Sequence, residues 1–121
     1  MKKLFFLLVV YSFALSTIMN AQETGVSSTE TMDPKAANYY NEAIQFMKAE
    51  QYENALKSID SSLMITKNYK TYYLQGQAYF KLGNTTDAVK SFEECVKLNP
   101  DYDMGWFAEG NANLILKKLR K

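Results

Sequence analysis

Apolar side chains recur every three or four positions through most of the chain, from residue 34 onward. That spacing places them on one face of an α-helix, which turns once in about 3.6 residues. Short breaks that contain polar residues, glycine or proline interrupt the pattern. The pattern therefore predicts an all-α chain with five helices, over residues 34–49, 52–66, 70–82, 85–98 and 103–118.

The predicted helix ends carry residues that favour starting or stopping a helix. Asp33 followed by Pro34 suits an N-cap and a first-turn proline. Gly83 stands where the third helix should stop, because glycine readily takes the left-handed conformation of a helix C-terminus. Either Thr85 or Thr86 can cap the fourth helix. These residues agree with the boundaries that the apolar pattern gives.

The apolar positions also repeat over a longer distance. Residues 36–68 align with residues 69–102 at an offset of 33, and an offset of 34 carries the start of the second unit onto a third. Aromatic residues align with aromatic ones and small residues with small ones: Tyr39, Tyr72 and Trp106; Tyr40, Tyr73 and Phe107; Ala43, Gly76 and Gly110; Ala55 and Ala88. So many matches in order indicate a repeated helical hairpin.

The second unit resembles the tetratricopeptide repeat (TPR) family, whose loose pattern combines aromatic, small and proline residues. The matching residues are Tyr72, Gly76, Tyr79, Gly83, Ala88, Phe92, Cys95 and Pro100. The first unit matches through Tyr39, Ala43, Phe46, Tyr52, Ala55, Ile59 and Ser62 but lacks the proline. The resemblance implies an α-solenoid of two TPR hairpins and a C-terminal capping helix. Within a domain of residues 34–121, repeat 1 covers about 36–68, repeat 2 about 69–102 and the capping helix about 103–119.

Small residues in each unit suggest where helices approach each other closely. Ala43, Gly76 and Gly110 share one repeat position, and a larger side chain there would push the two helices of a hairpin apart. Each hairpin covers only part of its apolar surface, so it needs a neighbour to cover the rest. Two repeats and a cap are close to the smallest stable array, which makes a homodimer a further expectation.

The N-terminal residues have the pattern of a cleaved secretory signal. Two lysines precede an apolar run, and the small Ala21 stands where a signal peptidase cuts. The run from Leu4 to Met19 is short for a membrane span, which takes about 20 apolar residues; a retained anchor is the alternative. We expect a signal peptide over residues 1–21 and a flexible linker over residues 22–33. The signal resembles those of Bacteroidota, which implies export to the periplasm or cell envelope, or secretion.

Composition narrows the possible chemistry. The 121 residues include 14 Lys and Arg, 13 Asp and Glu, no histidine and one cysteine. A net charge of +1 gives no reason to expect nucleic acid as a partner. Without histidine and with Cys95 alone, the usual zinc, haem and Cys/His catalytic sites cannot be assembled within one chain. We therefore expect no cofactor, no metal, no catalytic residue and no enzymatic activity, and we expect Cys95 to fill a small buried position.

In the TPR family, the first helix of each hairpin lines a concave groove that holds a peptide or a partner's helix. Carried over by position, the resemblance implies a groove lined by Tyr40, Ile44, Met47, Lys48, Tyr73, Gln77, Phe80, Lys81, Phe107, Asn111 and Leu114. Some members clamp the C-terminal carboxylate of a chaperone with Lys and Asn side chains. The corresponding residues here cannot do so: Tyr40, Ile44, Leu74, Met104 and Ala108.

These features predict an exported, non-catalytic scaffold whose groove binds a peptide or protein segment. Aromatic side chains bury much area with few rotatable bonds, which suits the centre of a binding surface. The alternative is a structural component of the envelope that assembles with copies of itself. Neither nucleic acid nor, after signal cleavage, a membrane span belongs to either hypothesis.

Overall fold

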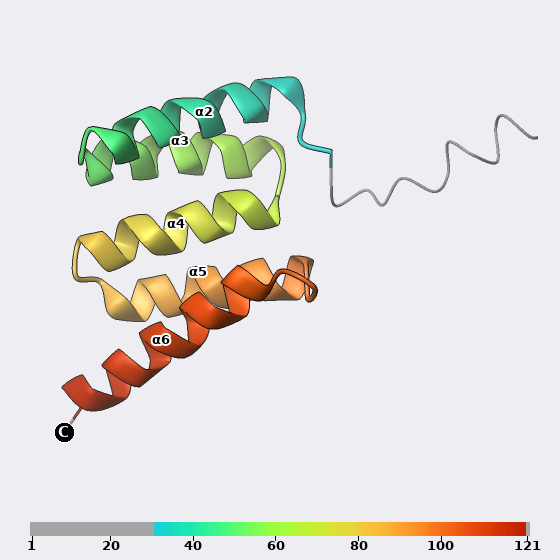
Figure 1. Ribbon diagram of the computed structural model, residues 1–121. Helices are drawn as coiled ribbons and strands as arrows, with labels where there is room; N and C mark the ends of the chain where they lie inside the picture. The colour runs from blue at the N-terminus through green and yellow to red at the C-terminus, as the bar shows by residue number, and fades with distance from the viewer. Residues whose placement is uncertain (1–30, 121) are drawn as a thin grey trace, which may run out of the picture. The chain divides into compact units, whose positions relative to one another are not determined.

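Five α-helices make up the part of the chain that the computed structural model describes, residues 31–120. They are α2 (Pro34–Lys48), α3 (Tyr52–Ile65), α4 (Tyr69–Lys81), α5 (Thr85–Leu98) and α6 (Asp103–Leu119). Helices α2 and α3 form one hairpin, α4 and α5 form the next, and α6 packs on α5 at the end of the stack (Figure 1). The predicted all-α solenoid of two hairpins and a C-terminal helix is confirmed.

The expectations for the N-terminus fall on residues that the structure does not describe. The predicted signal peptide, residues 1–21, and most of the predicted linker, residues 22–33, lie outside residues 31–120. Within residues 31–120, no helix has both the length and the apolar character that a membrane span requires.

The first helix begins as the sequence predicts. Oδ1 of Asp33 accepts a hydrogen bond of 2.8 Å from the backbone N–H of Lys35. Pro34 follows as the first helical residue, where its missing N–H costs no intrahelical hydrogen bond. The carboxylate of Asp33 therefore satisfies one of the free N–H groups at the start of α2.

Both hairpins turn through a residue with a positive φ. Gly83 has a φ of 81°, and Glu50, which precedes it by 33 positions, has a φ of 59°. In each turn the next residue donates its backbone N–H to a carbonyl five positions back: Gln51 to Phe46 at 2.8 Å and Asn84 to Tyr79 at 2.9 Å. The left-handed residue thus closes the first helix of each hairpin.

This turn also explains why the predicted cap of the fourth helix is wrong. Asn84, which closes α4, is itself the N-cap residue of α5, and its side chain makes no capping hydrogen bond. Thr85 is already helical and buried, and Thr86 lies inside the first turn. The turn at Gly83 leaves no non-helical position for either threonine, so neither can cap.

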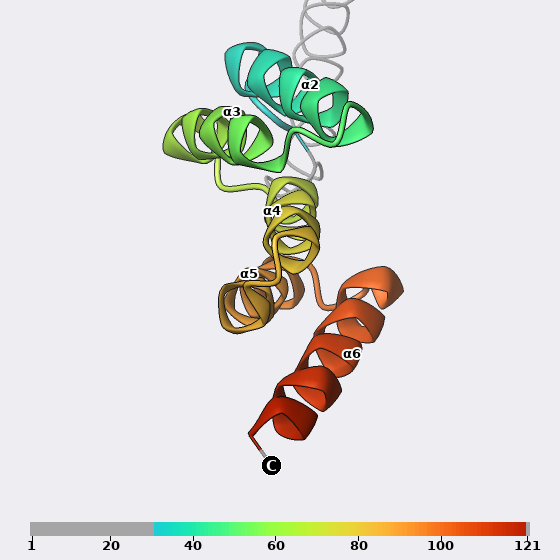
Figure 2. The ribbon, with the colours of Figure 1, turned by 90° about the vertical axis from the view of Figure 1, so that its left-hand side faces the viewer.

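The core forms two clusters, and each hairpin is closed by the first helix of the following unit. The first cluster holds Ala43, Ile59, Leu74 and Ala78, and the second holds Ala88, Val89, Phe92 and Ala112. Helix α4 therefore covers the first hairpin, and α6 covers the second (Figure 2). This is the arrangement that a repeat array requires, because a single hairpin leaves apolar surface exposed.

Two of the three small residues at the shared repeat position are buried as predicted. A Cβ atom at Gly76 would lie 2.6 Å from Cδ1 of Phe92, so glycine is what allows α4 and α5 to approach. Ala43 is fully buried beside Ile59 in the first cluster. The prediction of close packing is confirmed at both positions.

At Gly110 the same prediction is wrong. Gly110 is exposed, and a Cβ atom there would meet no other atom within 4 Å. The reason is that no helix within residues 31–120 packs on that side of α6. Helix α6 instead approaches α5 at Gly105, where a Cβ atom would lie 3.0 Å from Sγ of Cys95 and from Cγ1 of Val96.

Candidate functional site

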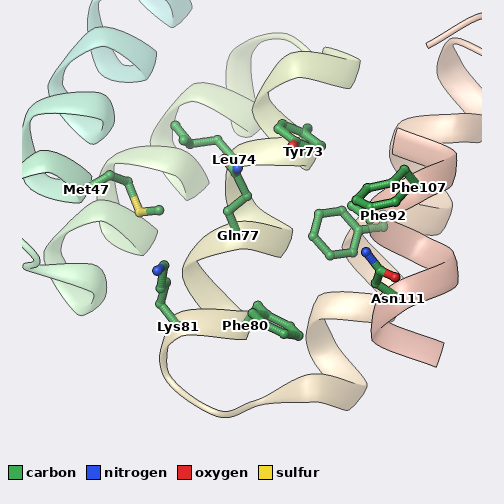
Figure 3. Close-up of a pocket in the computed structure, with 10 residues that line it drawn as sticks. Met47, Tyr73, Leu74, Gln77, Phe80, Lys81, Phe92, Phe107 and Asn111 are labelled. Atoms are coloured by element: carbon green, nitrogen blue, oxygen red, sulfur yellow. The ribbon is translucent and has the colours of Figure 1, made fainter. Parts of the chain in front are cut away.

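A pocket of about 370 Å³ opens between the first helices of the three units. Helices α4 and α6 supply most of its walls, while α2 and α5 supply one residue each (Figure 3). The residues that line it are Met47, Tyr73, Leu74, Gln77, Phe80, Lys81, Phe92, Phe107, Ala108 and Asn111. We call this surface the α4–α6 pocket. Its volume suits one large side chain or a short stretch of peptide.

Seven of the eleven predicted groove residues line the α4–α6 pocket: Met47, Tyr73, Gln77, Phe80, Lys81, Phe107 and Asn111. The other four do not. Tyr40 and Ile44 are partly buried against the first core cluster, while Lys48 and Leu114 are exposed outside the pocket. The structure thus brings together the four predicted residues of α4, two of the three from α6 and one of the four from α2; their role in binding stays a prediction.

Three lining residues were not among the predicted groove positions. Leu74 and Phe92 belong to the two core clusters and form part of the pocket wall at the same time. Ala108 lies one residue after Phe107, 34 positions beyond Leu74. Leu74 and Ala108 hold one repeat position and are two of the clamp-equivalent residues, which the resemblance had identified only as unable to bind a carboxylate.

The pocket wall is mainly apolar and includes four aromatic rings, two of which face solvent. Phe107 is 73% exposed and Phe80 is 40% exposed, although both carry apolar rings. In Figure 3 the ring of Phe92 lies between Phe80 and Phe107, while Gln77 and Met47 lie toward the other side of the pocket. Exposed aromatic rings around a concave apolar surface are typical of a protein-binding site.

Polar groups at the pocket are few and carry no negative charge. Among the lining residues, Gln77 and Asn111 offer amides, and Lys81 carries the one formal charge. An amide both donates and accepts hydrogen bonds, so this pair can match the N–H and C=O groups of an extended peptide. The ammonium group of Lys81 favours a ligand with a carboxylate near this end of the pocket.

Two aromatic rings of the core pack against Tyr73. Its ring lies 5.8 Å from that of Phe92 and 5.4 Å from that of Tyr102, the second at an interplanar angle of 90°. Burial, and then the nearby Cys95, raise the pKa of the Tyr73 hydroxyl above its ordinary value, so this wall of the pocket is uncharged at neutral pH. Tyr73 therefore supports the pocket and the second core cluster together.

Neither metal binding nor thiol chemistry finds support among the described residues. No group of three His, Cys, Asp or Glu side chains within residues 31–120 is placed to hold a metal ion. Cys95 is fully buried, and burial raises the pKa of its thiol to about 11. A thiol with such a pKa is protonated and unreactive at neutral pH. The prediction that Cys95 fills a buried position is confirmed.

Residues 69–102, which contain α4, α5 and the loop after them, match the family model of the tetratricopeptide repeat. By this match, the segment is similar to a tetratricopeptide repeat. The match includes Gly76, Ala88 and Phe92, which pack the two helices of the TPR hairpin against each other.

A known protein resembles a larger part of the chain. An Hsp70-Hsp90 organizing protein of Triticum aestivum is 27% identical over 94 residues, which are 76% of this chain and 16% of that protein. The chain thus spans about a sixth of the length of this relative.

Two solved TPR structures share the fold. The second TPR of Spaghetti (RPAP3), bound to the HSP90 peptide SRMEEVD, has a TM-score of 0.68 and 22% identity, and the match covers 72% of this chain and 82% of that one. The TPR domain of Sgt2 from Aspergillus fumigatus has a TM-score of 0.69 and 21% identity, over 79% of this chain and 64% of that one. The chain therefore has the TPR solenoid fold.

Proposed function

We propose that this chain is a non-catalytic scaffold that binds a segment of another protein in the α4–α6 pocket and the groove beside it. The observation that carries the proposal is the exposed pair Phe80 and Phe107 at the mouth of an apolar pocket of about 370 Å³. Leaving such rings in water is unfavourable, and a partner's side chain that covers them gains the burial. The Spaghetti TPR structure, which holds a peptide, supports this use of the fold.

The chemistry of the pocket favours one mode of binding. An apolar side chain of the partner enters between Phe80 and Phe107, while Gln77 and Asn111 bond to its backbone and Lys81 attracts a carboxylate. The residues at the clamp positions of chaperone-binding members argue against recognition of a chaperone tail. Leu74 is buried, Ala108 lines the pocket and Met104 is exposed, and none of them can pair with a terminal carboxylate.

A surface of this size supports moderate affinity. A single peptide in one short groove is expected to bind with a dissociation constant in the micromolar range, on the order of −8 kcal/mol. Loss of one central aromatic ring typically costs about 2 kcal/mol, which is roughly a thirtyfold loss of affinity.

Photo-crosslinking in the producing cells tests the proposal directly. Benzoylphenylalanine is placed at Phe107, beside the pocket, and in a second strain at Met64 on α3, which is 88% exposed and lies outside the pocket. We expect partner cross-links from position 107 and none from position 64. Equal cross-linking at both positions, or none at position 107, would contradict the groove assignment.

Alanine variants then measure the contribution of the pocket to affinity. Phe107→Ala is expected to weaken binding of the cross-linked partner segment roughly thirtyfold, and Met64→Ala should leave it unchanged. Tyr73→Ala is a poor probe, because Tyr73 packs on Phe92 and Tyr102 and its loss would disturb the fold. Titration calorimetry with the purified segment gives the constants. An unchanged constant for Phe107→Ala would refute the proposal.

The site of action that we propose lies outside the cytoplasm, in the periplasm or cell envelope of a bacterium of the Bacteroidota type. The support is the N-terminal pattern of two lysines, the apolar run and Ala21. Intact-mass measurement of the chain isolated from the producing cells tests this. We expect the mature chain to begin at Gln22; a chain that retains residues 1–21 would contradict cleavage.

A further inference from the structure

The outer face of α6 is apolar at its centre and uncovered within the described residues. Trp106 is 50% exposed and Leu114 is 55% exposed, and they lie one helical turn before and after Gly110. Gly105 and Ala112, the buried residues that pack α6 on the second hairpin, lie on another side of the helix. The indole N–H of Trp106 donates a hydrogen bond of 2.7 Å to the carbonyl of Pro100. We call Asp103, Trp106, Gly110, Leu114 and Lys117 the outer face of α6.

In the two hairpins, a second helix covers the equivalent positions. Ala43 of α2 packs with Ile59 of α3, and Gly76 of α4 faces the ring of Phe92 of α5. Gly110 holds the same repeat position on α6, but a Cβ atom there would meet nothing within 4 Å. The outer face of α6 thus has the small residue at its centre that close helix packing requires, without a helix on it among residues 31–120.

The residues of this face are arranged symmetrically about Gly110. Trp106 and Leu114 lie four residues before and after it, and Asp103 and Lys117 lie seven residues before and after it. The charges at the two ends are opposite. If an identical helix is laid across the face in the reverse direction, with Gly110 opposite Gly110, each Asp103 meets a Lys117 and each Trp106 meets a Leu114. The face is therefore complementary to itself.

We propose that two copies of the chain pair through the outer face of α6, with the two helices antiparallel and Gly110 at the twofold axis. An isologous contact of this kind places each residue against its complement twice. The two glycines let the helix axes come closer than the usual interaxial distance of about 8–10 Å. Trp106 of each copy then packs on Leu114 of the other. This pairing goes beyond the binding of a partner in the pocket and does not depend on it.

The expected dimer is weak, because the contact is small. Helix α6 has 17 residues and is thus about 25 Å long at roughly 1.5 Å per residue. One pair of helices of that length buries less than the roughly 1,200 Å² of a stable interface. We therefore expect a dimer whose population rises with concentration in the micromolar range.

Analytical ultracentrifugation tests the pairing, with the chain purified in the form in which it is isolated from the producing cells. We expect the mass to rise toward twice that of one chain between about 1 and 300 µM. Gly110→Glu places two carboxylates at the twofold axis and should abolish the dimer, while the folded chain tolerates it because the position is open. Gln45→Glu on α2 adds the same charge at an exposed position and should leave the dimer intact. Circular dichroism verifies that each variant is helical.

A charge exchange tests the antiparallel register itself. Asp103→Lys alone brings lysine against lysine, and Lys117→Asp alone brings aspartate against aspartate, so each variant should be monomeric where the unchanged chain is dimeric. Mixed together, the two variants form a heterodimer in which both contacts are again Lys with Asp, and dimerisation should return. A concentration-independent monomer for the unchanged chain would overturn the proposal, as would a Gly110→Glu dimer. A mixture that stays monomeric would overturn it as well.

Discussion

Alanine substitutions at Gly76 and Gly110 are predicted to change stability in opposite directions. The two glycines hold one repeat position, 34 residues apart, and each lies inside a helix. In both cases alanine lowers the conformational freedom of the unfolded chain and favours the helix by up to about 1 kcal/mol. What differs is the space that the new methyl group would enter.

At Gly76 the methyl group meets a ring that has little room to move. The added Cβ would lie 2.6 Å from Cδ1 of Phe92, which is 3% exposed and packs on Tyr73 at 5.8 Å between ring centroids. Overpacking of this kind costs about 1–3 kcal/mol. After subtraction of a helix gain of about 1 kcal/mol, Gly76→Ala should destabilise the fold by about 0–2 kcal/mol, and its midpoint should fall by up to roughly 16 °C. At Gly110 the methyl group meets nothing, so the helix gain remains and the midpoint should rise by up to about 8 °C.

Thermal and urea unfolding followed by circular dichroism measure both changes, at or below about 1 µM so that the outer face of α6 stays unpaired. A third pair of measurements compares Phe92→Leu with and without Gly76→Ala. Because the ring is absent in this background, Gly76→Ala should lower the free energy of unfolding clearly less. Stabilisation by Gly76→Ala, or destabilisation by Gly110→Ala, would refute the packing argument. An unchanged cost in the Phe92→Leu background would show that the ring is not the cause.

Three further predictions follow from single residues. Glu50→Gly should stabilise the chain by up to about 1 kcal/mol in urea unfolding, because a glutamate at a φ of 59° is strained and Gly83 shows the preferred residue for this turn. Cys95, with a pKa of about 11, should react with iodoacetamide at pH 8 at least about a hundredfold more slowly in the folded chain than in the unfolded chain. Burial and Glu93 raise the pKa of Glu109 above 4.5, so the folded chain loses stability as pH rises through that pKa. Glu109→Gln should accordingly raise the unfolding midpoint by about 2–4 °C at pH 7 and have no effect near pH 4; a gain of equal size at both values would contradict this.

The helices and the core could be predicted because both depend on spacing within a short window. The period that places Ala88, Phe92 and Cys95 on one helix face also buries them. The cap at Thr85 or Thr86 was wrong for a local reason as well. Two motifs overlapped there, and the left-handed turn at Gly83 determined where α5 begins. A capping residue in the sequence cannot show that the preceding helix has already used its position.

The prediction of close packing at Gly110 was wrong for a different reason, which concerns tertiary contacts. A repeat pattern transfers the residue type from Gly76 to Gly110, but it does not transfer the helix that Gly76 packs against. The contact that α6 makes with α5 uses Gly105, which is not one of the small residues at the shared repeat position. In the pocket, likewise, Phe92 was not among the predicted groove residues, although its ring lines the pocket as well as the core. A side chain at the edge of a core can contact the core on one side and a pocket on the other. Spacing along the chain indicates that the side chain is buried but not that it also lines a pocket.

Helix α6 unites the two proposals, because three of its faces have different surroundings. Gly105 and Ala112 pack on the second hairpin, Phe107 and Asn111 line the pocket, and Gly110 lies on the outer face. Since successive residues turn by about 100°, substitutions on one face leave the others unchanged as long as α6 does not move. The contact of Gly105 with Cys95 and Val96 at 3.0 Å resists such movement. Phe80→Ala, which changes the pocket on α4, should therefore weaken partner binding without affecting the dimer, and Gly110→Glu on α6 should abolish the dimer. If one substitution changed both, α6 would have to shift against α5 as a unit, and the pocket and the outer face would be a single coupled site.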